Sequence, residues 1–426
     1  MNRSHLSGRR AARLVVVCLL LLLAPTHDVL SEDGAPGPTQ ADIQRLQLGV
    51  LFDYSGRLGV HGPDLEHGVK LAVDQVNAAG GVLGRPVEVT IADGETDADA
   101  AVTKAREMID SGIDALVGPM GSQAALRVGA EVSGPLRVPT VTPSATSPEL
   151  SSIRDGGYLF RTALSDVAQG PVLADLAVRD GLERVSVIYQ DDAYGRGLFR
   201  AFRDAFAAFA GELAAAITVS PEADSYLDEL RRAAVGDSQA LLLIAYPGAT
   251  DILLKEALDE ELFHRFFFVD VNFGPDVVLS VGAERLEGQM GTIPIGASGI
   301  LPGYATVLAE LKERVQKPLR QGALAAYDAT VCLCLAAERA GSTDGTLLRD
   351  ALFEVCGGGG KRINAGAEGV ARALTAIRKG RNVDFDGATT PIDWDAAGDV
   401  TRGFVGVYRI QSGALVLVDR MAFEAA

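Results

Sequence analysis

Two short turns, each placed where an apolar strand ends, carry the side chains best suited to hold a small anion. The first turn reads Gly121-Ser122-Gln123, and its serine stands at the N-cap position of a predicted helix. The second turn contains Ser147 and Pro148, which are typical of the N-cap and the first position of a helix. Two helix N-termini in one crevice would bind a carboxylate through free N–H groups. Either turn alone is equally an ordinary capped loop, but the two together indicate a binding crevice.

Other kinds of site chemistry lack their usual sequence patterns. Neither turn has the Gly-x-x-x-x-Gly-Lys pattern of a phosphate-binding loop, and neither offers a lysine or arginine to a phosphate. Glycines 56, 59 and 62 lack dinucleotide-binding spacing, and no Ser-His-Asp elbow is present. Beyond the N-terminal leader the histidines are His61, His67 and His264, which form no metal-ligand pattern. We therefore expect a binding protein that is not an enzyme and holds no cofactor or metal ion.

Strands and helices alternate on both sides of these turns. From residue 46 to the second turn, the apolar patterns predict strands at 46–52, 87–93, 114–118 and 138–143, with helices at 64–79 and 98–110. A second series of alternating elements follows, with strands at 185–189, 215–219, 241–245 and 266–269 and helices at 198–210, 226–234 and 250–258. Later helices are predicted at 304–315, 327–340 and 370–379, before two strands at 404–408 and 414–418. This alternation predicts an α/β protein with two parallel sheets.

The N-terminus has the layout of a secretory signal peptide. Arg9, Arg10 and Arg13 precede an apolar run at 14–24, which is shorter than the roughly 20 residues a membrane-spanning helix needs. We expect a signal peptide at 1–30 and a flexible leader at 31–45, with an uncleaved anchor as the lesser alternative. The net charge is 39 − 56 = −17, which disfavours nucleic acid and anionic membranes as partners.

Three cysteines follow the leader in a chain that is expected to be exported. Cys332 and Cys334 lie early in one predicted helix, and Cys356 ends the next. A hairpin of the two helices could bring Cys356 close to either of the first two. The sequence leaves open whether a disulfide forms or the thiols stay free and buried.

An ordered series of short motifs resembles the leucine/isoleucine/valine-binding protein family, the type I periplasmic substrate-binding proteins of ABC importers. The motifs run in family order from residue 46 to the C-terminus, so the resemblance covers nearly the whole mature chain. They are Ser55-Gly56, the segment 77–84 (NAAGGVLG), Gly118-Pro119 with Ser122, the segment 142–150 (TPSATSPEL), Phe160-Arg161-Thr162, Asp192-Ala193-Tyr194-Gly195, Tyr327-Asp328-Ala329 and Trp394-Asp395.

This resemblance implies two Rossmann-like βα lobes joined by a three-segment hinge, with ligand between them. Placing the crossings near Ala163, Pro294 and Arg402 gives lobe 1 at 46–163 and 295–402. Lobe 2 then comprises 164–294 and 403–426. Hinge closure requires that the ligand contacts both lobes, because it shifts the equilibrium only through differential affinity.

The resemblance also assigns candidate ligand contacts. Ser122 and Thr146 match positions that hold a ligand carboxylate through hydroxyl and backbone N–H groups. Ser144 matches a position whose carbonyl faces a ligand ammonium, and Tyr194, in a loop after a lobe-2 strand, would close over the ligand. His61 matches an aromatic position beside the ligand side chain, although a solvent-exposed loop histidine is an equal alternative.

The ammonium partner is where the sequence departs from the family. The family's acidic residue aligns with Asn272, and an amide cannot neutralise an ammonium. Either Asp270 or Asp166 takes its place, or the ligand is not an α-amino acid. Tyr246 is a further candidate for the pocket, although the alignment equally allows Ala245.

The resemblance as a whole implies a periplasmic solute-binding protein. It would capture a small carboxylated solute, with an amino acid as the leading candidate, and deliver it to an ABC transporter permease. A ligand-sensing domain that acts with a separate signalling partner is the alternative. We expect a monomer that binds no nucleic acid.

Overall fold

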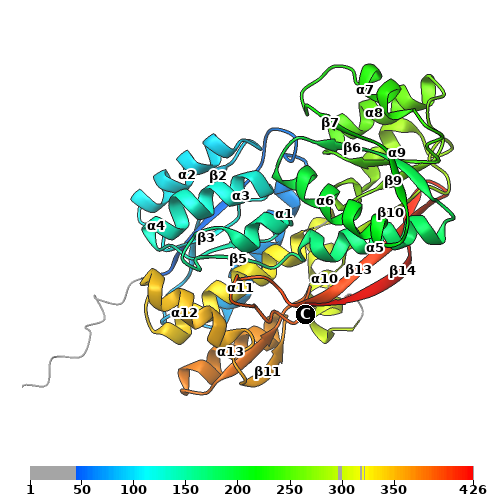
Figure 1. Ribbon diagram of the computed structural model, residues 1–426. Coiled ribbons are helices and arrows are strands. Elements are labelled where there is room, and N and C mark those ends of the chain that lie inside the picture. Colours follow the sequence, from blue (N-terminus) through cyan, green and yellow to red (C-terminus); the bar gives the residue numbers. More distant parts are fainter. Residues whose placement is uncertain (1–44, 296–299, 317–318, 321, 426) are drawn as a thin grey trace, which may run out of the picture. The chain divides into compact units, whose positions relative to one another are not determined.

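The computed structural model describes residues 45–295, 300–316, 319–320 and 322–425 (Figure 1). These residues belong to one compact unit, Ile43–Ala426. The predicted signal peptide and all but the last residue of the predicted leader lie outside the described residues.

A five-stranded parallel sheet forms the centre of lobe 1, with the order β2-β1-β3-β4-β5. Its strands are β1 (Gln47–Phe52), β2 (Glu88–Asp93), β3 (Ala115–Val117), β4 (Thr140–Thr142) and β5 (Leu159–Arg161). Its crossover helices are α1 (Gly62–Ala78), α2 (Ala98–Asp110) and α3 (Ser122–Val128), the last continuing through η1 (Gly129–Ser133) and α4 (Gly134–Leu136). The central strands β1, β3 and β4 are buried, and β1 and β3 are largely apolar, as expected for a parallel sheet covered on both faces.

A seven-stranded sheet of order β14-β13-β10-β9-β8-β6-β7 forms the centre of lobe 2. Its strands are β6 (Arg184–Gln190), β7 (Glu212–Val219), β8 (Leu241–Ile244), β9 (Phe266–Phe268), β10 (Met290–Pro294), β13 (Arg402–Gln411) and β14 (Ala414–Glu424). The β10–β13 and β13–β14 pairings are antiparallel, and the other pairings of this sheet are parallel. The lobe's helical segments are α5 (Asp166–Arg179), α6 (Ala193–Ala208), α7 (Leu227–Ala233), α8 (Pro247–Asp259), η3 (Asp270–Asn272) and α9 (Pro275–Val281).

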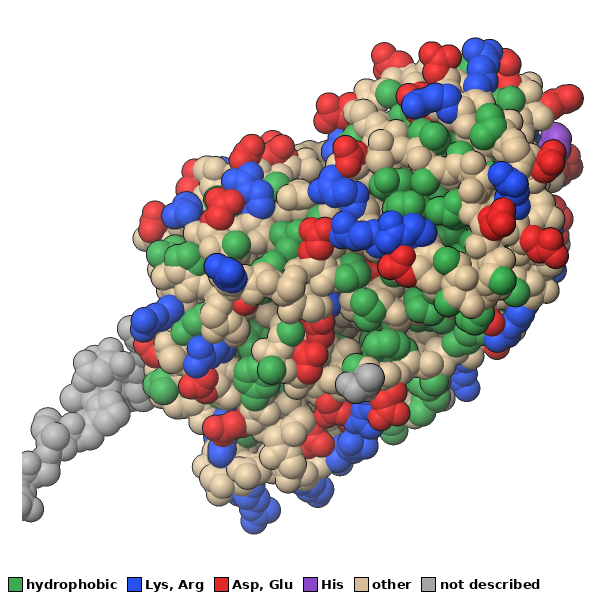
Figure 2. Space-filling view, viewed as in Figure 1, with side chains coloured by type: hydrophobic (Ala, Val, Ile, Leu, Met, Phe, Trp, Pro, Cys, Tyr) green, Lys and Arg blue, Asp and Glu red, His purple; other side chains and the backbone are tan. Residues whose placement is uncertain are grey.

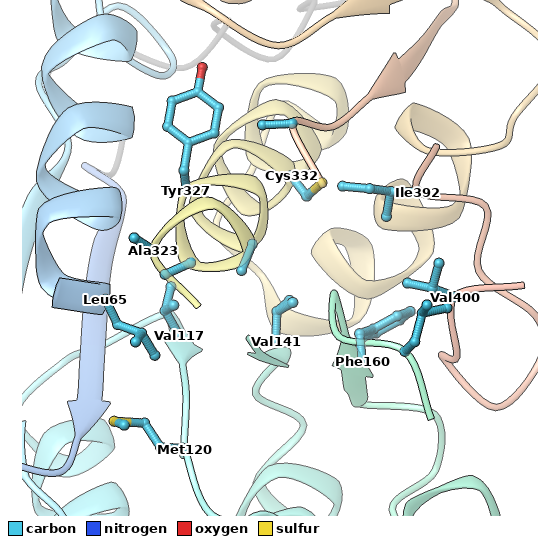
Figure 3. Packing of buried hydrophobic residues seen from close by; sticks show 14 of the residues in the cluster. Leu65, Val117, Met120, Val141, Phe160, Ala323, Tyr327, Cys332, Ile392 and Val400 are labelled. Carbon is cyan, nitrogen blue, oxygen red and sulfur yellow. The ribbon is translucent and has the colours of Figure 1, made fainter. Parts of the chain in front are cut away.

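Four late helices return to lobe 1. They are α10 (Pro302–Val315), α11 (Ala323–Ala340), α12 (Gly345–Val355) and α13 (Ala367–Arg378), accompanied by the short strands β11 (Lys361–Asn364) and β12 (Val383–Asp386). Helix α11 is buried along nearly its whole length and packs against α1 and α12. Figure 3 shows Ala323 of α11 close to Leu65 of α1, and Met120 where the chain continues past Val117 of β3.

The chain changes sheet three times, after β5, after β10 and before β13. The predicted α/β fold of two lobes with three connecting segments is confirmed. The division at residues 163, 294 and 402 remains our proposal for the exact lobe boundaries, and these changes of sheet support it.

The helices of lobe 2 differ from the sequence prediction at several places, and the differences at α5 and α6 bear most on the site. Helix α6 begins at Ala193, within the predicted turn, because the Asp192 side chain caps it by accepting a hydrogen bond from the Gly195 N–H (2.8 Å). Helix α5 was not predicted, since Pro171 and the preceding glycine interrupt its helical pattern. Tyr194 therefore lies in the first turn of a helix and not in a loop.

The structure also shows which cysteine lies next to Cys356. Its Sγ atom is 3.2 Å from the Sγ of Cys332, while Cys334 lies elsewhere in the core. All three thiols are free and buried in the structure. Of the two pairings that the sequence left open, the structure favours Cys332 with Cys356.

Candidate ligand-binding site

A cavity of about 370 Å³ is lined by residues of both lobes, which is within the usual size range of small-molecule sites. Much of its wall is aliphatic or aromatic, including Leu58, Leu65, Met120, Leu164, Val271, Phe273 and Ile293. Seven of the nine predicted site residues line it, namely His61, Ser122, Ser144, Thr146, Tyr194, Tyr246 and Asp270. An apolar cavity with a few convergent polar groups can orient a small amphipathic solute.

The first turn of the predicted anion site is built differently from the prediction. Gly121, and not Ser122, is the N-cap of α3, and no side chain caps this helix. The hydroxyl oxygen of Ser122 instead accepts hydrogen bonds from the N–H groups of Thr146 and Ser147, both at 3.2 Å. The capping role assigned to Ser122 was therefore wrong, because its side chain holds the second turn in place. The Ser122 hydroxyl proton is left available to the cavity.

The second turn keeps its predicted cap but opens a shorter helix. Ser147 accepts from the Glu149 N–H (3.3 Å) at the start of a five-residue 3-10 helix, η2 (Pro148–Ser152). The hydroxyl of Ser144 donates to the Met120 carbonyl (3.0 Å), so its side chain has only acceptor capacity left for a ligand. The prediction of two N-termini with free N–H groups is thus only partly met, since two of those N–H groups already bond to Ser122.

An acidic and aromatic cluster from lobe 2 forms another part of the wall. The Tyr194 hydroxyl donates to Asp270 Oδ1 (2.7 Å), and its ring stacks on Tyr246 with centroids 5.6 Å apart. Asp270 is 8% exposed and lies in η3, directly after the end of β9. Burial raises the pKa of Asp270, and the hydrogen bond from Tyr194 opposes that rise. Tyr246, and not Ala245, is the residue that lines the cavity.

Two predicted site residues do not line the cavity. The amide nitrogen of Asn272 donates to the Ala245 carbonyl (3.2 Å) and the Thr250 hydroxyl (3.1 Å), so this side chain holds η3 against α8. Asp166, the first residue of α5, lies behind Thr146 and accepts from its hydroxyl (3.1 Å). Asp270 is therefore the predicted acid that faces the cavity.

A second polar group of residues surrounds His61, at the entry to α1. Burial, and after it the nearby Arg320 charge, lower the pKa of His61 to about 4, so the imidazole is neutral at pH 7. Arg320 pairs with Asp64 of α1 (3.3 Å) and, in a bidentate contact, with Asp276 of α9 (2.9 and 3.0 Å). The Asp276 contact joins the two lobes beside the cavity.

Several lining residues were not identified from the sequence. Arg320 is a single arginine in a connecting segment, with no pattern around it that signals a site. Thr389 and Thr390 follow β12 in a turn held by the buried carboxylate of Asp328, which accepts from the N–H groups of Ala388 and Thr389. The small-residue turn after a strand was the available signal for these threonines.

A profile of the family described as "Periplasmic binding protein" matches residues 45–413, which is most of the chain. The chain belongs to the periplasmic binding protein family. The predicted family resemblance is thereby confirmed, and members of this family work outside the cytoplasm. Within the described residues, no helix has the length and apolar character needed to cross a membrane.

Two relatives show different roles within the family. A leucine-, isoleucine-, valine-, threonine- and alanine-binding protein of Pseudomonas aeruginosa is 27% identical over 315 residues, covering 72% of this chain and 82% of the relative. A chemotactic signal transduction substrate-binding protein, BasB of Halobacterium salinarum, is 26% identical over 373 residues, covering 85% and 86%.

Solved structures share the fold of this periplasmic binding protein at low sequence identity. A branched-chain amino acid transporter substrate-binding protein from Streptococcus pneumoniae, in complex with isoleucine, has a TM-score of 0.74 at 21% identity, covering 89% of this chain and 100% of that one. A solute-binding protein of an ABC transporter from R. palustris, in complex with benzoate, has a TM-score of 0.70 at 16% identity, covering 90% and 98%.

Proposed function

We propose that this protein captures an α-amino acid with an apolar side chain between its lobes and delivers it to an ABC transporter permease. Asp270 carries this proposal, because it is a buried carboxylate on the cavity wall with no ion-pair partner among the described residues. A buried carboxylate is stabilised when a cation pairs with it. A ligand ammonium supplies such a cation, whereas a benzoate would bring only a second negative charge.

The other walls support the remaining parts of an amino acid. The Ser122 hydroxyl donates to the carboxylate, together with first-turn N–H groups of α3, a helix that no side chain caps. The Ser144 carbonyl accepts from the ammonium. The aliphatic wall and the stacked pair of Tyr194 and Tyr246 surround the side chain. These assignments join groups from both lobes, as ligand-driven closure requires.

Isothermal titration calorimetry with defined ligands tests the proposal. We expect L-leucine, L-isoleucine or L-valine to bind, and benzoate to bind at least a hundredfold more weakly. Asp270→Asn should lose at least tenfold in affinity for the amino acid, and so should the double variant with Ser122→Ala and Thr146→Ala. Asp259→Asn is a matched control, because Asp259 pairs with Arg285 on the surface of lobe 2. Benzoate binding tighter than all three amino acids would refute the proposal.

A sensing role is the second candidate, favoured by the similarity to the chemotactic binding protein of Halobacterium salinarum. The ligand site would be the same, but the partner would be a signalling receptor. Deleting the gene separates the two roles, because loss of uptake of radiolabelled ligand indicates transport and loss of chemotaxis alone indicates sensing.

Export and monomeric state are part of the same proposal. We propose that the protein is periplasmic, with residues 1–30 removed, and that it acts as a monomer that binds no nucleic acid. Cell fractionation, N-terminal sequencing of the mature protein and light scattering check these points directly.

A further inference from the structure

The buried acid behind the cavity, Asp166, has an unusual set of hydrogen bonds. Its side chain is 0% exposed, and Oδ2 accepts from the Thr146 hydroxyl (3.1 Å). Its Oδ1 atom is also buried and has no hydrogen-bond donor within the described part of the chain. An ionised carboxylate that leaves one buried oxygen without a donor is strongly unfavourable.

A second buried acceptor without a donor lies one turn further along α5. The Gln169 amide nitrogen donates to the Thr292 hydroxyl and carbonyl (3.2 and 3.3 Å), while its Oε1 atom is buried with no donor among the described residues. Side chains three residues apart in a helix share one face. One proton on Asp166 Oδ1 would satisfy both oxygens, because the acid would donate and the amide oxygen would accept.

The charged and titratable groups around Asp166 do not favour its ionised form. Asp270 of η3 repels a second negative charge, and Tyr194 of α6 offers its hydroxyl to Asp270. Arg161 of β5 is the nearby cation, but its guanidinium bonds to Asp399 (2.7 Å) and to the Ser147 carbonyl (2.9 Å). Burial and then the Asp270 charge raise the pKa of Asp166 well above its usual range.

We propose that Asp166 is a neutral carboxylic acid in the folded protein and a positioning residue for the ammonium subsite. The carboxyl proton of Asp166 is donated to the Gln169 amide oxygen. This hydrogen bond orients the side-chain amide so that its N–H groups face Thr292 and Asp270. The Gln169 amide stabilises the ionised form of Asp270. The subsite then carries one negative charge, on Asp270, and matches a ligand with a single ammonium group.

The positioning role of Asp166 rests on the proposed function, because it requires a ligand with an ammonium group. The protonation state of Asp166 can be tested without a ligand. Infrared spectra of the protein at pH 8 should contain the carbonyl band of a protonated carboxyl group, and Asp166→Asn should remove it. Burial raises the pKa of Asp53 to about 6 and that of Asp328 to about 7, so both acids are mainly ionised at pH 8. Asp328→Asn should therefore leave the band in place.

Two outcomes of the spectral test would overturn the proposal. One is a wild-type protein without a protonated carboxyl band at pH 8, and the other is a band that persists in Asp166→Asn. If that variant does not fold, the wild-type protein labelled with ¹³C at its aspartates gives the same answer. We then expect one carboxyl resonance to keep the chemical shift of the neutral acid from pH 5 to pH 8.

Binding of L-leucine, L-isoleucine or L-valine tests the positioning role. Asn resembles the neutral acid in shape and can still donate to Gln169, so Asp166→Asn should bind at least tenfold more tightly than Asp166→Ala. Equal losses in both variants would show that the negative charge of Asp166 is needed. If none of these amino acids binds but the band is present, the proposed function fails while the neutral Asp166 stands.

Discussion

The hydrogen bonds of its hydroxyl group determine what Ser122 can offer to a ligand. Its oxygen accepts from two backbone N–H groups of the neighbouring turn, so the hydroxyl has only its proton to offer to a ligand. Donors that are themselves hydrogen-bonded in this way are strengthened by polarisation. Ser122 therefore suits a negatively charged ligand atom and not a positively charged one.

His61 gives a prediction about stability and pH. The pKa of its imidazole is about 6.5 when unfolded and about 4 when folded, mainly because of burial. As pH falls from 6.5 to 4, the unfolded chain takes up the proton first, so the folded state loses stability. At pH 4.5 this loss is about 2.5 kcal/mol relative to pH 7.

The variant His61→Gln should not show this loss. Urea denaturation at pH 7 and pH 4.5 measures it as the difference between the two proteins. The raised pKa values of Asp53 and Asp328 act in the opposite direction, but they are present in both proteins and cancel. Parallel pH curves for wild type and variant would contradict the buried, neutral histidine.

Helix packing sets the wall of the cavity at the scale of secondary-structure elements. Gly68 lies in the middle of α1, where an added Cβ would come within 1.9 Å of the Ala323 carbonyl oxygen. Ala323 begins α11 and lines the cavity. The absence of a side chain at Gly68 therefore lets α1 approach the helix that forms this wall.

Gly68→Ala should destabilise the protein by about 2 kcal/mol, because the overpacking outweighs the better helix propensity of alanine. Gly248→Ala is the matched control. Gly248 is also helical, in α8, and an added Cβ there meets no atom within 4 Å. Urea denaturation of both variants checks the prediction, and equal stabilities would contradict the close α1–α11 contact.

The thiol pair between α11 and α12 gives a second prediction at this scale. Cys332 and Cys356 are buried, so a disulfide must form before α12 docks, by exchange with an external disulfide that accepts the two electrons. Protein exported to an oxidising compartment should contain this bond. Closing a loop of this length should add about 3 kcal/mol to stability.

Alkylation of the denatured, unreduced protein followed by mass spectrometry measures the bond. Cys334 should be labelled, while Cys332 and Cys356 should be labelled only after reduction. Cys334→Ser should leave Cys332 and Cys356 protected until reduction, whereas Cys356→Ser should expose Cys332 to the reagent. Free labelling of all three positions would show that the thiols stay reduced.

The sequence predicted four of the five strands of the lobe 1 sheet because their apolar patterns are local, whereas β5, β11 and β12 were not predicted. Helix α2 matches its predicted span, and β3 is one residue shorter at each end than predicted, since each pattern ends at a clear polar or glycine residue. Helix α5 was missed because Pro171 interrupts its pattern although the helix tolerates it. Most of the site residues predicted from the family resemblance line the cavity, but their hydrogen bonds were not predicted. Ser122 follows β3 and Thr146 follows β4, so the two residues meet only after these strands pair side by side.

Ion pairs between the lobes act at the scale of the whole molecule. Acidic and basic side chains are interspersed over the face shown in Figure 2. Among the residues that the structure describes, three pairs join lobe 1 to lobe 2, namely Arg57–Glu222 (3.0 Å), Glu149–Arg200 and Arg320–Asp276. Arg320 is the least exposed of these arginines and makes the bidentate contact, so we expect its pair to matter most.

Asp276→Asn removes the cross-lobe contact of Arg320 while leaving its bond to Asp64 in lobe 1. Because the ligand binds to the closed state, a variant with a smaller closed-to-open equilibrium constant loses apparent affinity by the factor by which that constant falls. We expect a three- to tenfold loss for the bound amino acid in 50 mM salt, measured by calorimetry. Asp259→Asn, which breaks a surface pair within lobe 2, should change the affinity by less than twofold.

The salt dependence of the ligand affinity shows whether the Asp276 substitution acts by removing an electrostatic attraction between the lobes or by changing local packing. Raising the salt from 50 to 500 mM shortens the screening length to a few ångströms and weakens partly exposed pairs. The wild-type affinity should then fall toward that of Asp276→Asn, because screening and mutation remove the same attraction. An affinity gap that stays constant across this range would mean that the carboxylate acts through packing, and that closure does not depend on the Arg320 pair.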